Sequence, residues 1–163
     1  MPTLNTFSIQ QAAGKRSQPS PPTLASTGPI LNVLIEIPGA LAQSFNTKNT
    51  PVPPPVTGIA LVDTAASITS FDESVAQRLG LSPVGTAPVG TAGGKGTRSI
   101  YQARFTFPGT PLPGFEHPNV LGCDLSGQTV LDQQPIIALI GRDILANAVL
   151  VYNGLAGFWS LSF

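Results

Sequence analysis

The sequence is poor in the residues that form metal sites, disulfides and thiol nucleophiles. Its 163 residues include one cysteine, Cys123, and one histidine, His117. A single cysteine excludes an internal disulfide and gives no sign of a secreted, disulfide-stabilised protein. No Cys/His/carboxylate cluster has metal-site spacing, and Gly-x-Ser-x-Gly, the pattern of nucleophile-elbow hydrolases, does not occur. Cys123 is then interpreted as a lone buried thiol, with a Cys123–His117 nucleophile pair as the alternative.

Charge and long apolar runs are scarce as well. Only 10% of residues are charged, and 8 basic and 8 acidic residues give a formal net charge of zero. This balance gives no electrostatic footprint for nucleic acid. No apolar run approaches the ~20 residues of a membrane span, and the N-terminus lacks the basic start and apolar core of a signal peptide. We therefore expect a cytoplasmic protein without nucleic-acid or membrane partners, whose sparsely charged surface favours self-association.

Glycine and proline are abundant, at 17 residues each. This favours strands joined by turns over long helices, and the length suits one domain with its own core. Residues 1–29 are predicted to form a flexible, Pro-rich N-terminal arm, with a candidate strand at residues 4–9. Residues 30–163 are predicted to form the folded domain.

Apolar runs predict strands at residues 31–37, 59–62, 120–121 and 136–140. Hairpins are predicted over residues 84–107 and 149–163. In the first hairpin, alternation places Tyr101, Ala103, Phe105 and Phe107 on one face. Pro-rich residues 43–55 and 108–118 are predicted loops. A second, short helix is predicted from residue 142 to about residue 147.

The best helix signal lies at residues 71–80. Ser70 or Asp72 can cap the helix, acidic residues occupy its first turn, and Gly80 ends it. Asp72 and Glu73 are thereby interpreted as helix-start residues and not as catalytic acids, because carboxylates are favourable at that end of a helix.

Residues 59–67, Ile-Ala-Leu-Val-Asp-Thr-Ala-Ala-Ser, are the most informative stretch of the chain. An apolar run delivers Asp63 into a cluster of small residues. A carboxylate at the end of a buried strand loses hydration, so it requires hydrogen bonds, a partner charge or a shared proton. Asp63 is therefore either a catalytic carboxylate or the cap of a turn.

A second motif follows far downstream, where residues 138–145 read Ala-Leu-Ile-Gly-Arg-Asp-Ile-Leu. Apolar-Asp-Thr-Gly-Ala-Ser followed by apolar-apolar-Gly-Arg-Asp/Asn-apolar-Leu is the pattern of the retropepsin-like, single-domain aspartic proteases. The chain resembles this family over roughly residues 30–163. It departs from the pattern at Ala65, where the family has glycine.

The resemblance implies an all-β, closed-barrel-like fold with one or two short helices. It also implies an active site with Asp63 as catalytic acid/base, Thr64 bonding across to a second protomer, and Ala65 beside the substrate. Arg142 and Asp143 would brace the active-site loop; the alternative is a solvated Arg and a helix-start Asp. No metal or organic cofactor is implied.

The Gly-rich turn at residues 90–96 matches the family's flap, a hairpin that closes over bound peptide. Its substrate-binding residues would be Gly90, Thr91, Ala92, Gly93 and Gly94. Glycines allow such a tip to bend and its backbone to approach the substrate, although an ordinary mobile hairpin tip has the same composition. A phosphate-binding loop is rejected, because Val89 stands where its first glycine belongs and Gly96 follows the lysine.

One motif per chain supplies one carboxylate, whereas hydrolysis by an aspartic pair needs two. The resemblance therefore implies a homodimeric aspartic endopeptidase that cleaves a peptide or protein substrate through a water activated by Asp63 and its symmetry mate. The alternative is a weak or inactive pseudo-protease that binds peptides or partners as a dimer. The feature that separates them is Ala65, because glycine at that position can be required for its backbone dihedrals.

Overall fold

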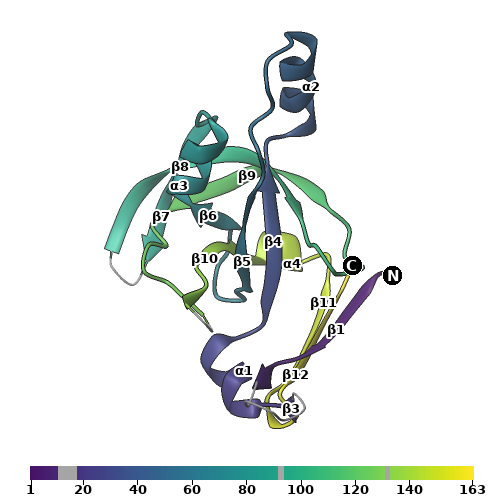
Figure 1. The fold of residues 1–163 in the computed structure, drawn as a ribbon. Helices are drawn as coiled ribbons and strands as arrows, with labels where there is room; N and C mark the ends of the chain where they lie inside the picture. The colour runs from purple at the N-terminus through teal and green to yellow at the C-terminus, as the bar shows by residue number, and fades with distance from the viewer. Residues whose placement is uncertain (11–17, 92–93, 131–132) are drawn as a thin grey trace.

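The computed structural model describes residues 1–10, 18–91, 94–130 and 133–163 (Figure 1). Seven strands form the main sheet, in the order β4-β5-β10-β6-β9-β8-β7. Strand β4 also pairs with β8, so six of the seven strands close into a ring and β7 extends β8 as a hairpin. The seven strands are β4 (Ile30–Glu36), β5 (Val56–Val62), β6 (Ser70–Asp72), β7 (Gly85–Thr91), β8 (Gly94–Thr106), β9 (Phe115–Cys123) and β10 (Ile136–Ile140). The predicted closed-barrel-like, all-β fold is confirmed.

The ring encloses the hydrophobic core. Tyr101, Ala103, Phe105 and Phe107 point into it and are all buried, which confirms the face predicted from alternation along β8. The register between β8 and β9 shifts between Tyr101 and Ala103, and Pro118 of β9 lies opposite this irregular pair. Proline is tolerated there because an irregular pair does not require its missing N–H.

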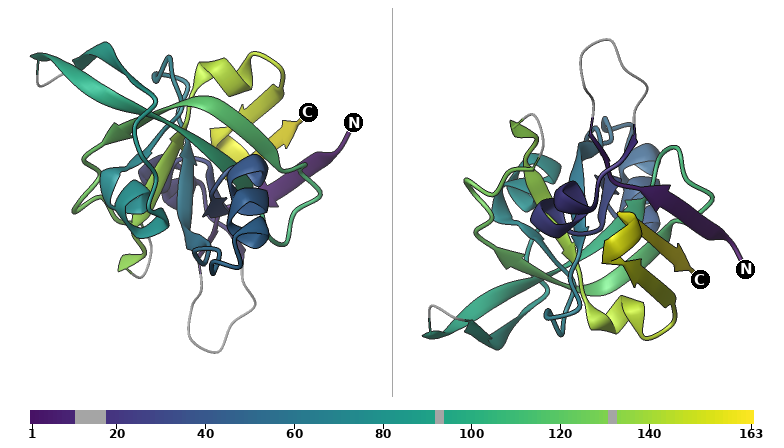
Figure 2. Two further views of the ribbon diagram at one scale, coloured as in Figure 1. Left: turned by 90° about the horizontal axis from the view of Figure 1, so that it is seen from above. Right: turned by 90° about the horizontal axis from the view of Figure 1, so that it is seen from below.

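A second, three-stranded sheet contains both ends of the chain. Its order is β1 (Thr3–Phe7), β12 (Phe158–Ser162) and β11 (Val149–Asn153), and all of its pairs are antiparallel. Its central strand β12 buries Trp159 and Leu161 in the same core as the ring. The β7–β8 hairpin and the two termini lie on opposite sides of the molecule (Figure 2).

The described parts of the predicted flexible arm, residues 1–10 and 18–29, contain strands and a helix, whereas residues 11–17 lie outside the described residues. Strand β1 pairs along β12, and short strands β2 (Ile9–Gln10) and β3 (Gln18–Pro19) pair with each other. Helix α1 (Pro21–Thr27) follows, with Ser20 as its N-cap. Its Leu24 is completely buried. Burial of one leucine and pairing with the C-terminal strand outweigh the polar, Pro-rich composition on which the prediction rested.

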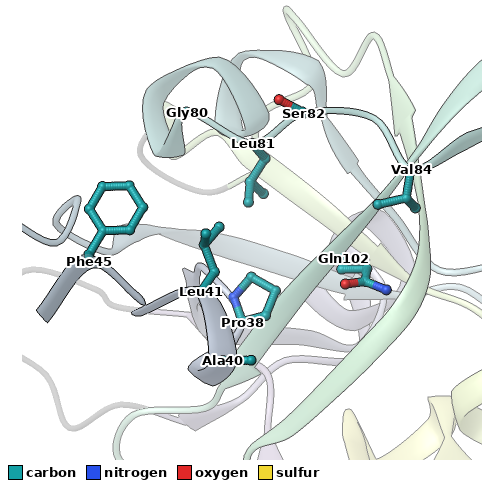
Figure 3. A pocket seen from close by; sticks show the side chains of 9 residues that line it. All are labelled: Pro38, Ala40, Leu41, Phe45, Gly80, Leu81, Ser82, Val84 and Gln102. Carbon is teal, nitrogen blue, oxygen red and sulfur yellow. The ribbon is translucent and has the colours of Figure 1, made fainter. Parts of the chain in front are cut away.

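Residues 39–47 are another correction, because they form helix α2 (Gly39–Thr47) where a loop was predicted from residue 43. Pro38 occupies the N-cap, and the stiffening prolines begin only at residue 51. Helix α2 has no buried residue and projects away from the ring in Figure 1. It forms one wall of an apolar cavity of about 340 Å³ (Figure 3). The other wall comes from the residues just after Leu79 and from the base of the β7–β8 hairpin, and the lining includes Leu41, Phe45, Leu81 and Val84.

The other predicted elements lie close to their expected positions. Helix α3 (Glu73–Leu79) begins after Asp72, whose side chain caps it, and ends at Gly80, which has a left-handed φ of 63°. Helix α4 covers Arg142–Leu145, and a 3-10 turn, Gly154–Ala156, connects β11 to β12. Strand β9 starts at Phe115, inside the predicted loop 108–118, because the Phe115 ring stacks on Phe105 of β8 at 5.5 Å.

Candidate active site

Asp63 follows the last residue of β5, beside the end of β10. Its N–H donates to the Ile140 carbonyl at 3.0 Å, so the pairing of β5 with β10 continues one residue into the loop. Its Oδ1 accepts hydrogen bonds from the Ala65 N–H at 2.8 Å and the Ala66 N–H at 3.3 Å. Oδ2 accepts no hydrogen bond within the described part of the chain. One carboxylate oxygen thus caps the turn, and the other is available for a water, a substrate or a partner chain.

Ala65 lies on the exposed side of this turn. Its φ is negative; among the described non-glycine residues only Asn49 and Gln133 have positive values. Alanine adopts such a backbone without strain, since only a left-handed φ favours glycine. The β-carbon of Ala65 is therefore accommodated, and the dihedral requirement raised by the sequence does not apply to this turn.

Arg142 holds the same loop from the start of α4. Its Nη1 donates to the Thr64 carbonyl at 2.7 Å and to the Ala65 carbonyl at 2.8 Å. Its backbone N–H donates to the Ala66 carbonyl at 2.9 Å. Three successive carbonyls of the loop are thus bonded to one residue. This is the geometry expected of a bracing arginine.

Asp143 holds the far end of the loop. Its carboxylate accepts from the Thr69 N–H, at 2.9 Å for the shorter contact, and from the Thr69 hydroxyl at 2.8 Å. His117 Nε2 lies 2.9 Å from its Oδ2. Burial by itself would raise the pKa of Asp143, but the bonds from Thr69 and His117 together outweigh it and leave that pKa below its ordinary value.

The end of β10 approaches this loop very closely at Gly141. A β-carbon at Gly141 would lie 2.7 Å from the Ile68 carbonyl carbon and 2.8 Å from the Thr69 nitrogen. The Gly141 N–H donates to the Thr69 hydroxyl at 3.0 Å. Glycine is therefore required at residue 141 for the two motifs to meet.

A cavity of about 420 Å³ lies between this loop and the β7–β8 hairpin. The loop contributes Ala65 and Ile68, and the hairpin contributes Val89 and Gly90. The rest of the lining comes from residues that include Ser70, Arg98, Leu121, Cys123, Asp124 and Leu139. The structure thus brings Gly90, predicted to lie in the flap, to the same cavity as Ala65 of the Asp63 loop.

Of the remaining predicted flap residues, the structure describes Thr91 and Gly94. Thr91 pairs with Gly94 across the two strands, and Gly94 has a φ of 121°. Ala92 and Gly93 lie outside the described residues. Gly94 therefore has the backbone conformation that a glycine-requiring turn predicts.

Cys123 and His117 do not form the nucleophile pair that was the alternative for them. The Cys123 thiol donates to the Phe71 carbonyl at 3.4 Å, whereas His117 contacts Asp143. Burial, the largest effect, raises the pKa of Cys123 and so favours the unreactive thiol. No group of three or more His, Cys, Asp or Glu side chains suited to a metal gathers among the described residues.

Sequence reasoning missed Thr69, Arg98 and His117. Thr69 has no distinctive sequence context and is recognised only through its bonds to Asp143. Arg98 was assigned to the hairpin without a role. His117 was placed in a loop, and the one available signal, its alternation with the aromatic Phe115, is too short to indicate a strand.

Comparison with known proteins gives one family match. A family model described as "Aspartyl protease" matches residues 55–144, a range that contains both Asp63 and the Arg142–Asp143 pair. No curated protein matches. The solution structure of Simian Foamy Virus (mac) protease is similar at 18% sequence identity and a TM-score of 0.42, covering 72% of this chain and 92% of that chain. None of the helices described has the length and apolar character that a membrane crossing demands.

Proposed function

The chain belongs to the retropepsin-like aspartyl protease family, and from this premise we propose that it is a homodimeric aspartic endopeptidase. The observation that carries the proposal is the Asp63 turn. It presents one carboxylate oxygen without a partner in the described chain, and Arg142 braces it through three carbonyls. One such turn per chain supplies half of a carboxylate pair, so a second copy must supply the other half.

In the proposed mechanism, Asp63 and its symmetry mate share one proton. Two like charges held a few ångströms apart are not both ionised cheaply, so one carboxylate stays protonated. The ionised carboxylate takes a proton from a water, which attacks the scissile carbonyl, while the protonated one donates to the carbonyl oxygen. The bonds to Oδ1 from Ala65 and Ala66 fix the carboxylate before reaction.

The substrate in this proposal is an extended peptide. The cavity between the Asp63 loop and the β7–β8 hairpin would hold its side chains, and backbone groups near Gly90 would pair with it as with an added strand. The Thr64 hydroxyl forms no hydrogen bond within the described residues, and Thr64 is exposed. It is therefore free to bond across the dimer.

The alternative is a pseudo-protease that only binds peptides. It was raised by Ala65, and the negative φ of that residue removes its main physical support. We therefore favour the enzyme.

The test is peptide hydrolysis at several pH values by the natural chain, by Asp63→Asn and by Glu36→Gln. Glu36 is a matched carboxylate outside the cavity, in an exposed ion pair with Arg104. We expect Asp63→Asn to abolish hydrolysis and Glu36→Gln to retain it. Hydrolysis that persists at the natural rate in Asp63→Asn would indicate another mechanism.

Mixing the chains then tests the shared pair. Adding excess Asp63→Asn chain to a fixed amount of natural chain should draw the latter into mixed dimers with one carboxylate, and activity should fall. Activity that is unaffected by excess variant would exclude a pair shared between two chains.

A further inference from the structure

Strand β9, one of the strands of the ring, carries His117, whose side chain reaches Asp143 of the Arg142–Asp143 motif. His117 Nε2 lies 2.9 Å from the Asp143 Oδ2, and both side chains are mostly buried, at 18% and 22% exposure. Within the described chain this is the one carboxylate within 4 Å of His117. Neighbouring charges are engaged elsewhere, since Glu116 accepts from the Gly39 N–H and Arg104 pairs with Glu36.

The two carboxylate oxygens of Asp143 accept hydrogen bonds from different sets of donors. Oδ1 accepts from the Thr69 hydroxyl at 2.8 Å and from its own neighbour, the Ile144 N–H, at 2.9 Å. Oδ2 accepts from His117, and the Thr69 N–H is shared between Oδ2 at 2.9 Å and Oδ1 at 3.0 Å. His117 therefore supplies the one donor that Oδ2 does not share with Oδ1. Without it, Oδ2 would keep a single protein donor and the carboxylate would be freer to rotate.

Thr69 is the point at which this bond network reaches the catalytic loop. It is completely buried, and its carbonyl accepts from the Leu121 N–H at 3.0 Å. Its hydroxyl accepts from the Gly141 N–H, next to Arg142. The chain from Asp63 to Thr69 is thus fixed at one end by Arg142 and at the other by Asp143.

We propose that His117 is a positioning residue for the catalytic loop. By donating from Nε2 it holds the Asp143 carboxylate in the orientation that fixes Thr69, and through Thr69 it fixes the loop that presents Asp63. An imidazole donates from Nε2 as the imidazolium or as the Nε2–H tautomer, so the contact selects these two forms. The expected effect of His117 on kcat rests on the proposed proteolytic function. Its expected effect on the position of Thr69 rests on the hydrogen bonds alone.

The experiment compares His117→Leu, which removes the donor, with His117→Gln, whose amide nitrogen can reach the same oxygen. The first readout is amide hydrogen exchange at Thr69, followed by NMR on the full chain. We expect exchange at Thr69 to become about tenfold faster in His117→Leu and to return toward the natural rate in His117→Gln. If the leucine variant does not fold, His117→Asn, whose shorter amide falls short of Oδ2, takes its place.

The second readout is peptide hydrolysis. A displaced loop changes the position of the Asp63 carboxylate relative to the scissile bond, and it changes the binding of the substrate in the cavity less. We therefore expect kcat to fall about tenfold in His117→Leu with KM nearly unchanged, and the glutamine variant to recover most of the loss.

Tyr101→Phe is the matched control. It removes a part-buried bond from the neighbouring strand, in which the Tyr101 hydroxyl donates to Glu73 at 2.9 Å. Within the described chain, Glu73 forms no hydrogen bond to the loop of residues 63–69. We expect this variant to lose stability and keep kcat.

Three results would overturn the proposal: Thr69 exchange unchanged in His117→Leu, equal losses in the leucine and glutamine variants, or a loss of kcat that Tyr101→Phe reproduces. If the natural chain hydrolyses no peptide, the proposed function fails on its own, and the exchange rate at Thr69 still decides the role of His117.

Discussion

At the scale of single residues, the Asp63 turn accommodates the methyl group of Ala65 without strain. Ala65 has a negative φ and lies on the exposed side of the turn, so its β-carbon neither strains the backbone nor fills the core. The carbonyl that Arg142 bonds is present whichever side chain residue 65 carries. Alanine at this position is thus compatible with the same turn that a glycine would form.

A substitution at residue 65 tests this conclusion. We expect Ala65→Gly to lower the free energy of unfolding by roughly 0.5–1 kcal/mol, because glycine gives the unfolded chain more freedom. Its kcat should stay within about threefold of the natural value, since ~1.4 kcal/mol in the barrier is needed for a tenfold change. Chemical denaturation and hydrolysis rates measure the two effects. A tenfold rise in kcat would instead show that the methyl group obstructs catalysis.

Asp143 gives a pH dependence of stability. Its pKa in the folded protein is lowered, since the bonds from Thr69 and His117 outweigh the burial that would raise it, so the ionised form is bound more tightly to the fold than the protonated one. Its contribution is present above the ordinary aspartate value of about 3.9 and is lost as pH falls through the lower folded value.

We therefore expect the natural chain to lose stability as the pH falls below about 4, and Asp143→Asn to lose less over the same interval. Thermal unfolding midpoints between about pH 2 and pH 7 measure this. Identical slopes for the two chains would show that Asp143 does not contribute. The comparison matters for any assay at acidic pH, because a fall in rate can then reflect unfolding and not catalysis.

At the scale of elements, Gly90 and Gly96 of the β7–β8 hairpin have similar surroundings but lie differently relative to the cavity. A β-carbon added at Gly90 or at Gly96 would meet nothing within 4 Å, so both sites have room for a side chain. Only Gly90 lines the cavity beside the Asp63 loop. The pair therefore separates a role in substrate binding from a general effect on the hairpin.

We expect Gly90→Val to raise KM several-fold while the fold survives, because the branched side chain stiffens the strand and enters the space that a peptide would occupy. Gly96→Val should leave KM close to the natural value. Steady-state kinetics on the two variants, with circular dichroism to confirm folding, measures the difference. Equal KM values would reduce this segment to an ordinary hairpin.

At the scale of the whole molecule, the exposed apolar side chains of the terminal sheet offer a surface for the proposed dimer. Both edges of β12 are occupied within the chain, by β1 and by β11. The outer edge of β11 carries exposed apolar side chains, Val149, Val151 and Tyr152, and the following turn carries Leu155, which is 97% exposed. Val149 and Val151 share the outward face of the sheet, paired with Ser162 and Ser160, and exposed apolar side chains on one face are typical of an interface between proteins.

A charge placed on this sheet should weaken self-association. We expect Val151→Lys to shift the sedimentation profile toward monomer and to lower activity most at low protein concentration, because an unpaired charge is costly to bury. Val52→Lys is the control, since Val52 is also exposed but lies in the Pro-rich segment before β5. Proteolysis by a species that sediments only as monomer would contradict the dimer.

Local sequence determined the elements that carry strong short-range signals. The strand before Asp63 was predicted because four apolar residues precede one acid, and α3 because Asp72 and Gly80 mark its ends. The β7–β8 hairpin and the inward face of β8 followed from glycine content and alternation. The two motifs around Asp63 and Arg142 were likewise visible in sequence, since each is a contiguous run.

What only the tertiary structure decided are the contacts between segments far apart in the chain. The pairing of β4 with β8 closes the ring, the pairing of β1 with β12 orders the N-terminal residues, and Leu24 is buried in α1. None of these has a local signal, because the free energy comes from surfaces that meet only on folding. The same holds for His117, whose sequence neighbours indicate a loop. Only the pairing of β9 with β8 in the folded ring, with α4 nearby, brings its Nε2 to Asp143. A hydrogen bond depends on where two atoms lie in space and not on how far apart they are in the sequence.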